Sequence, residues 1–347
     1  MEAVILKCRP GSRFHLGLSA MRQNETLTDT AEIIHSDVLF GAFITAVAQQ
    51  CPDDIEKWKT HFEKGNIHFS SAFYCVEYQG KNIYLLPKPI HLNGYKLNES
   101  NSYINAHKQL KKVRFLSKDV WEKQLLPNDW FAENSACFLP ENRAVFLREE
   151  FGGTDPIFKL SEKTDTPKVK VRQQSEEGNL YTQTDLTIMG NEDAVVHWYF
   201  LWDKFGLSEE EKADAKKLIE QMAETGIGGE RSTGCGHIES VCFPSDFSIK
   251  EDIAGDLFTS LSLIIPQEAE TTHLLAYQVV QRGGMYYGAE SSGKRIKVIN
   301  ALAEGAILHQ PISGRIADLS TSEKKHWRNG MAFTIPLPKA YHLNNEP

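Results

Sequence analysis

Residues 224–239 read ETGIGGERSTGCGHIE, and five glycines fall within eleven consecutive positions. The segment before this stretch carries the strongest helix signal in the chain, because Ser208 and Glu211 form a capping box and an apolar stripe follows at helical spacing. Gly226 stands where a glycine commonly ends a helix. Residues 237–243 then favour a strand. The chain must therefore pass from a helix to a strand through nearly bare backbone.

This glycine-rich loop fits neither of two common phosphate-binding motifs. A P-loop needs a lysine directly after its last glycine, but Cys235 follows Gly234, and a dinucleotide fingerprint needs a glycine where Arg231 stands. Both motifs also run from strand to helix, so that the positive helix end faces the phosphate. Here the negative end of a helix adjoins the loop, so cationic side chains such as Arg231 and backbone N–H groups must attract any polyanion. The glycines equally suit a tight helix-to-strand turn.

Length and charge limit the classes of protein that fit. At 347 residues the chain exceeds one ordinary domain of ~100–200 residues, which predicts two packed units. The net charge of −8 argues against a protein that coats nucleic acid indiscriminately, so RNA contacts are expected only in local basic patches. The six cysteines form no C-x-x-C pair, which is typical of reduced thiols. Without a secretory signal or a long apolar segment, a cytoplasmic protein with no membrane contact is expected.

The order of the predicted elements favours an α+β fold. Residues 2–8 form a predicted buried strand, Ser36 is expected to cap a buried helix, and residues 67–86 form a predicted hairpin. The middle of the chain, roughly 93–165, has a weak pattern and is expected to hold insertions, with one helix near 103–112. A second β-rich part follows and contains the helix that enters the glycine-rich loop.

The two halves look alike in outline, which predicts two ferredoxin-like domains of the RRM-like, split-βαβ type. The first is expected at 1–165 and includes the insertions. The second is expected at 166–347 and carries the glycine-rich loop.

The glycine-rich loop resembles the signature of RAMP proteins, the RNA-binding subunits of CRISPR effector complexes, because a helix runs into G-x-G-G-E-R-S-x-G-x-G. Two further motifs support the resemblance: HSDVLFGAF at 35–43 and LLPKP at 85–89. In their order and spacing these motifs are similar to the family of the fourth Csm subunit of type III-A systems. The resemblance covers most of residues 1–245 and continues more loosely to the C-terminus.

The resemblance implies a fold, a function and partners. It implies two ferredoxin-like domains of RAMP type, with RNA lying across the glycine-rich loop and the basic surface beside it. The subunit would hold the 5′ tag of the crRNA in an antiviral ribonucleoprotein, without being an enzyme. Its expected protein partners are the large multidomain Csm subunit and an adjacent backbone RAMP subunit. We expect no catalytic residue, no cofactor and no metal.

The residues predicted to bind RNA come from several parts of the sequence. In the loop they are Gly226, Gly228, Gly229, Glu230, Arg231, Ser232 and Gly234. Near the first strand, helix and hairpin they are Arg13, His15, His35, Ser36 and Lys88. Further along come a helix face and its flank, Lys108, Lys111, Lys112 and Arg114, and a C-terminal group, Arg282, Tyr286 and Arg295. Three cations on one side of a predicted strand form another patch: Lys168, Lys170 and Arg172. A single patch of this kind is more often a solvated surface, and the tyrosines equally suit a core.

Two other functions fit parts of the sequence. RAMP folds include metal-free endoribonucleases that process crRNA, and cleavage at a 2′-OH needs a general base, a general acid and a cation. His15 and His35 would supply the acid and base, with Arg13 or Lys88 as the cation. Single histidines near turns are more often structural, so a non-catalytic subunit is the preferred hypothesis. The third possibility is a scaffold that binds only protein, in which the loop shapes an interface.

Overall fold

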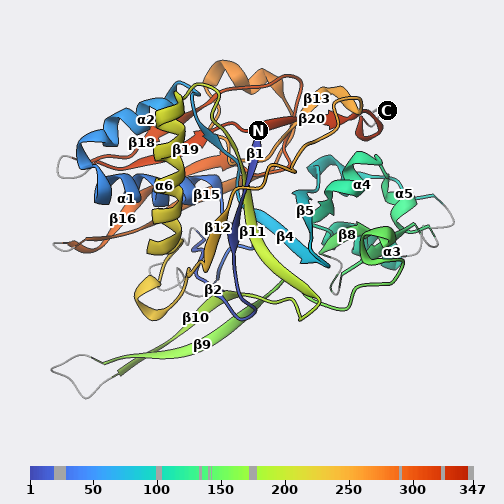
Figure 1. Ribbon diagram of the computed structural model, residues 1–347, viewed down its shortest axis with the longest axis horizontal. Coiled ribbons are helices and arrows are strands. Elements are labelled where there is room, and N and C mark those ends of the chain that lie inside the picture. The colour runs from blue at the N-terminus through green and yellow to red at the C-terminus, as the bar shows by residue number, and fades with distance from the viewer. Residues whose placement is uncertain are drawn as a thin grey trace.

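The computed structural model describes residues 1–18, 29–98, 104–132, 135–139, 141, 143–171, 178–288, 291–321 and 325–342. For residues 104, 170–171, 178–179, 285–288 and 291–295 it describes the backbone but not the side chain. The described chain is a mixed α+β structure with several β-sheets (Figure 1). The α+β class predicted from the sequence is therefore confirmed. None of the helices in this part of the chain combines the length and apolarity that a membrane span requires.

The largest sheet is built around the first strand, β1 (Glu2–Lys7). β1 lies between β11 (Ala194–Asp203) and β12 (Ser240–Cys242), and β4 (Phe73–Tyr78) pairs with the far side of β11. All three pairings are antiparallel. The central residues of β1 are apolar and buried without alternation, as in a strand that is covered on both faces.

Two helices connect these strands. α1 (Ser36–Gln50) follows β1, and α6 (Glu209–Thr225) joins β11 to β12 through the glycine-rich loop. The two helices lie side by side (Figure 1). The predicted capping box of α6 is confirmed, because Ser208 Oγ accepts from the backbone N–H of Glu211, whose carboxylate accepts from the N–H of Ser208. A short helix, α2 (Ile55–Glu63), and a short strand, β3 (His68–Phe69), lie between α1 and β4.

The strand pairing does not follow the expected domain boundary between residues 165 and 166. β11 and β12 come after that boundary, yet they lie in the same sheet as β1 and β4. The reason is that the chain between β4 and β11 is a long excursion, so the second half of the unit resumes only at Ala194. The glycine-rich loop therefore belongs to the unit that contains β1.

The excursion forms a lobe and a hairpin (Figure 1). The lobe extends the large sheet with β5 (Lys81–Pro87), β6 (Phe115–Ser117), β8 (Ala144–Leu147) and β7 (Ala136–Phe138). Its helices are α3 (Ile104–Lys112), α4 (Lys118–Glu122) and α5 (Pro127–Trp130). The hairpin consists of β9 (Ser161–Val171) and β10 (Gly178–Ile188), and β10 pairs with the two-residue strand β2 (Arg13–Phe14). Figure 1 shows the hairpin extending away from the large sheet.

The C-terminal part has a smaller antiparallel sheet with the strand order β14-β17-β13-β20. These strands are β13 (Ala254–Ser260), β14 (Leu274–Ala276), β17 (Ile307–Leu308) and β20 (Thr334–Pro338). Two strand pairs accompany it, β15 (Val279–Gly288) with β16 (Ser291–Leu302) and β18 (Gly314–Asp318) with β19 (Trp327–Met331). One continuous cluster of buried side chains includes Val4 and Leu218 as well as Phe333 and Leu337, so the two parts share a core.

Candidate nucleic-acid interface

The glycine-rich loop leaves α6 at Gly226 and closes on itself at Gly236. The backbone N–H of Gly226 still donates to Ala223 O, which ends the helix. The N–H of Ile227 donates to Gly236 O at 3.0 Å, so the two ends of the loop are tied together at its base. The loop is therefore a defined turn whose middle projects beyond the helix.

Residues 13–15 hold the loop in place through backbone hydrogen bonds. The backbone N–H of Gly229 donates to His15 O at 2.9 Å, and the N–H of Gly236 donates to Arg13 O at 2.7 Å. His15 and Gly229 form an antiparallel bridge. The position of the loop thus depends on the short strand β2 and the residue that follows it.

The glycines are needed for contacts within the protein. A Cβ on Gly228, whose φ is +98°, would lie 2.8 Å from His15 O, and a Cβ on Gly236, whose φ is +78°, would lie 2.3 Å from Ile227 O. Only at Gly234 does the Cβ direction point into open space. The sequence predicts that these glycines let RNA approach the backbone, whereas Gly228 and Gly236 are explained by close packing on the protein's own chain.

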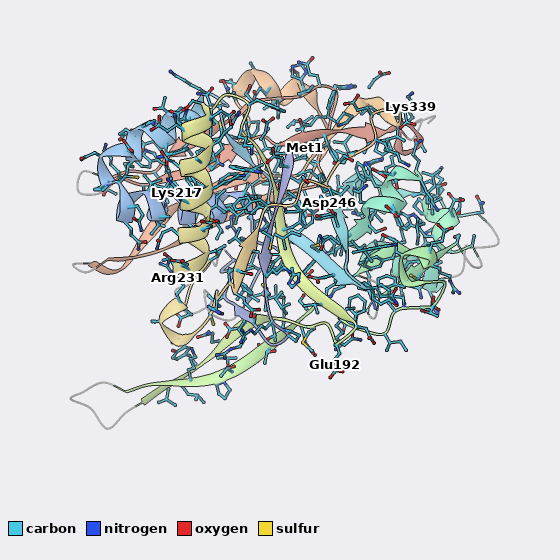
Figure 2. The ribbon with its side chains drawn as sticks, in the orientation of Figure 1. Met1, Glu192, Lys217, Arg231, Asp246 and Lys339 are labelled. Carbon is cyan, nitrogen blue, oxygen red and sulfur yellow. The ribbon has the colours of Figure 1, made fainter. Side chains whose placement is uncertain are left out.

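The apex of the loop carries its charged residues. Glu230 has a left-handed backbone, with φ of 55°, and Arg231 and Ser232 begin a short 3-10 turn. Arg231 is exposed, and its guanidinium has no acidic partner in the part of the chain that the structure describes. Glu230 Oε2 lies 3.8 Å from Nζ of Lys168 on β9, which places the apex beside the hairpin. Figure 2 shows Arg231 beyond the end of α6, on the side of the β9–β10 hairpin.

A buried polar cluster lies beneath the loop. Nδ1 of His15 is 3.1 Å from Thr184 O and 3.4 Å from Oδ1 of Asp185. Nη1 of Arg13 is 3.9 Å from Oδ2 of Asp185, and the Cys235 thiol donates to the same oxygen at 3.6 Å. His15 is thus buried under the loop, while the side chain of Arg13 is partly exposed at the loop's edge. Among the described residues, no three His, Cys, Asp or Glu side chains group as metal ligands would.

Sequence reasoning did not find Asp185 or its neighbour Gln183. Both side chains are fully buried, and Gln183 Nε2 donates to Asp185 Oδ1 at 2.7 Å. The available signal was two polar residues at positions i and i+2 of a strand, which places them on one face. That signal predicts a shared face but not that the glycine-rich loop covers it.

Two residues at the start of α1 that were predicted to bind RNA instead contact the C-terminal part. Nδ1 of His35 is 2.8 Å from Oε1 of Glu304, and that carboxylate is buried. Ser36 is predicted to cap α1, but His35 holds that position. The Ser36 hydroxyl accepts from the backbone N–H of Leu263 at 3.1 Å. Neither side chain is presented to a ligand outside the protein.

Arg282 was also predicted to bind RNA, and it too is occupied internally. Its side chain is 5% exposed, and its Nε and Nη2 donate to the two carboxylate oxygens of Asp37 at 3.0 and 3.1 Å. Arg328 bonds the same carboxylate and also donates to Gly283 O at 2.9 Å. We call Asp37, Arg282 and Arg328 the Asp37 ion cluster. It joins α1 to the C-terminal strands, which explains why these charges are buried.

Lys88 is likewise not a surface cation. It is 7% exposed, and its Nζ donates to Leu110 O at 2.5 Å. Burial and, after it, the positive charge of Arg114 lower the pKa of Lys88 to about 7. A lysine in this position contributes packing and one hydrogen bond, not a phosphate contact.

The remaining predicted residues do not gather at the loop. The four basic residues of the α3 region are exposed as predicted: Lys108, Lys111, Lys112 and Arg114. However, α3 lies on the opposite side of the molecule from the glycine-rich loop (Figure 1). The side chains of Tyr286, Arg295 and Lys170, and Arg172 as a whole, lie outside the described residues.

Comparison with known proteins finds similarity to one kind of CRISPR protein. Residues 254–337 match the model of the CRISPR Csm4 C-terminal domain. The chain is 29% identical over 357 aligned positions to the CRISPR system Cms protein Csm4 of Methanocaldococcus jannaschii, with 92% of this chain and 89% of that protein covered.

Solved structures share the fold. The Csm3-Csm4 subcomplex of a type III-A CRISPR-Cas interference complex contains a chain that matches with a TM-score of 0.65 and 24% identity, over 97% of this chain and 99% of that one. A chain of the Csm1-Csm4 cassette in complex with pppApA matches with a TM-score of 0.56 and 18% identity, over 97% and 98%. In the domain match, the relative and the shared fold, this chain is similar to the fourth Csm subunit, Csm4, of type III-A CRISPR effector complexes.

Proposed function

We propose that the chain is a non-catalytic subunit of a type III-A CRISPR (Csm) interference complex and that it holds the 5′ tag of the crRNA. The observation that carries this proposal is the exposed Arg231 at the apex of a loop whose backbone is fixed on β2. Lys168 of the hairpin lies beside the apex, where its Nζ is 3.8 Å from the Glu230 carboxylate. A rigid cationic turn beside a projecting hairpin suits the backbone of a single RNA strand.

In this proposal Arg231 supplies most of the attraction for RNA phosphates, because neither the backbone N–H groups of the loop nor the nearby helix end can supply it. The backbone N–H groups of Ile227, Gly229, Cys235 and Gly236 donate within the protein. The adjoining helix end is the negative end of α6, which does not attract phosphate. A side-chain cation at the apex is what remains.

The proposed protein partners follow from the solved relatives, which are described as a Csm3-Csm4 subcomplex and a Csm1-Csm4 cassette. We infer that this chain likewise docks a backbone RAMP subunit and the large multidomain subunit in the cytoplasm. The net charge of −8 supports assembly through protein contacts, because RNA attraction is confined to a small part of the surface.

The domain arrangement that we propose differs from the expected one. The strand order β12-β1-β11-β4 has the alternation of a split βαβ unit, with α1 and α6 as its two helices. The order β20-β13-β17-β14 repeats this arrangement in the C-terminal part, where a 3-10 helix (Glu268–His273) and the β18–β19 pair stand in place of the helices. We therefore assign one ferredoxin-like unit to 2–242, interrupted by the excursion, and a second to 254–338.

Arg231→Ala is expected to weaken crRNA retention by roughly ten- to a hundredfold at physiological salt, since a hydrogen bond to a charged group contributes roughly 1.5–3 kcal/mol. The slope of log affinity against log salt concentration should fall by about 0.7, the value for one phosphate contact on a single strand. The measurement is the crRNA content of the co-purified complex over a salt series. Lys108→Ala removes a cation from α3 and serves as the control. Equal retention by Arg231→Ala and wild type would refute RNA binding by the loop.

The non-catalytic part of the proposal has its own test. The two histidines of the endoribonuclease alternative contact different groups, His15 at Asp185 and His35 at Glu304. We expect the purified protein to leave repeat RNA uncut over hours, with or without Mg²⁺, on a denaturing gel. Reproducible cleavage that disappears in both His15→Ala and His35→Ala would show instead that the subunit is a nuclease.

A further inference from the structure

The carboxylate of Asp185 touches side chains from three segments that are far apart in the sequence. Asp185 lies on β10 of the hairpin and is fully buried. It meets Arg13 and His15, which precede α1, and Cys235, which belongs to the glycine-rich loop. One side chain thus connects the hairpin, the support beneath the loop and the loop itself.

Only a few residues hold the loop in place. β2 has only two residues, and it is hydrogen-bonded to β10 on one side, while the loop bonds to residues 13–15. The contact between Cys235 and Asp185 passes directly from the loop to β10, at 3.6 Å between Sγ and Oδ2. It is therefore a second link between the loop and the hairpin, in parallel with the link through β2.

The Cys235 thiol and the Asp185 carboxylate are suited to form a hydrogen bond with each other. Burial raises the pKa of the Cys235 thiol, and the charge of Asp185 raises it further. The thiol therefore stays protonated and donates its hydrogen to the carboxylate. A buried carboxylate needs such donors, and Gln183 Nε2 supplies another at 2.7 Å.

We infer that Asp185 and Cys235 are a positioning pair that fixes the glycine-rich loop against the β9–β10 hairpin. The pair does not touch RNA. It holds Arg231 of the loop in a fixed position beside Lys168 of the hairpin, so that little conformational ordering is needed when RNA binds. This inference rests on the proposed function, because it assigns to the pair a role in presenting the RNA-binding loop.

The test compares Cys235→Ala with Cys235→Ser in the full chain, co-expressed with its partner subunits and crRNA. Alanine removes the donor to Asp185, whereas serine keeps one, and neither change alters the charge near RNA. Loss of one hydrogen bond predicts crRNA retention about three- to tenfold weaker for Cys235→Ala. Cys235→Ser should stay close to wild type. The slope of log affinity against log salt concentration should be unchanged in both variants, because no phosphate contact is removed.

Amide hydrogen exchange of the full chain supplies a second readout. The N–H groups of Gly229 and Gly236 donate to β2 and its neighbour, so they report how firmly the loop is seated. In Cys235→Ala these two amides should exchange several-fold faster, while the amides of β1 and α6 keep their protection. Asp185→Asn, which changes the charge, is compared by amide exchange alone and should show the same local loss.

The outcomes separate this inference from the proposed function. If Arg231→Ala weakens retention but Cys235→Ala does not, the loop binds RNA and the positioning role is wrong. If Cys235→Ala or Asp185→Asn loses protection throughout the chain, the pair serves general stability, and the inference also fails. If Arg231→Ala retains crRNA as wild type does, the proposed function itself fails.

Discussion

Asp37→Ala is expected to lower the free energy of unfolding by about 3–5 kcal/mol, the range for removing one partner of a buried ion pair. Asp37 holds two buried guanidinium groups, those of Arg282 and Arg328, and both would remain as buried cations without their carboxylate. The measurement is urea denaturation of the full chain. Because the Asp37 ion cluster joins α1 to the C-terminal strands, the variant should also unfold in more than one step.

An exposed ion pair provides the control for this experiment. Asp214 and Lys217 lie three residues apart on α6, where the Asp214 side chain is half-exposed and the Lys217 side chain is exposed. Asp214→Ala should change the free energy of unfolding by less than about 1 kcal/mol. A loss below that same limit for Asp37→Ala would mean that the two arginines find other partners, and the cluster would not be the link described above.

The pH dependence of the cluster has a definite sign. Burial alone would raise the pKa of Asp37, but the charges of Arg282 and Arg328 outweigh burial and hold the pKa well below its ordinary value. The folded-state pKa is therefore lower than the unfolded-state pKa of about 3.9. The cluster stabilises the fold fully above that unfolded-state value and loses its contribution as the pH falls through the folded-state pKa.

Gly228→Val is expected to reduce crRNA retention more than tenfold, although Arg231 remains in place. A left-handed residue that is not glycine costs roughly 1–3 kcal/mol, and a β-branched side chain is especially unsuited to it. The added Cβ would also lie 2.8 Å from His15 O, the acceptor for the N–H of Gly229. The loop must then leave its support on β2. The ratio of crRNA to protein in the purified complex measures the effect.

Gly234→Val is the matched control for Gly228→Val. Gly234 also has a left-handed backbone, with φ of +88°, but no atom lies within 4 Å of the added Cβ. It shares the backbone strain without the collision and should therefore have the smaller effect. If Gly228→Val lost crRNA while the Gly229 amide kept its protection from exchange, the valine would block RNA from outside, and the packing explanation would be wrong.

Local signals predicted the helix that enters the loop, whereas long-range pairing could not be predicted. The capping box at Ser208 and the glycine at 226 lie within one segment, and the structure confirms both. The pairing of β1 with β12 joins residues about 235 positions apart, and no local pattern encodes it. The expected boundary at 165 differed from the strand pairing for this reason, since the excursion separates the two halves of one sheet.

The candidate site shows the same contrast between local signals and long-range contacts. Arg231 and the loop could be located because their sequence is unusual, and Arg231 is exposed. His35 and Arg282 could not be excluded from the sequence, because their carboxylate partners lie 269 and 245 positions away. A basic residue at the surface and one in a buried ion pair cannot be distinguished from the sequence. Only the fold separates them.

The place of β1 in the sheet also governs when the protein can fold during its synthesis. β1 leaves the ribosome long before its two neighbours, β11 and β12, which end at residues 203 and 242. At ~5–20 residues per second, roughly 12–50 s pass before residue 242 has been added. Both edges of β1 lack a partner strand until β11 has been made, and one edge still lacks its partner until β12 has been made. We therefore expect the nascent chain to expose an aggregation-prone strand during this interval and to be bound there by chaperones that recognise extended apolar segments.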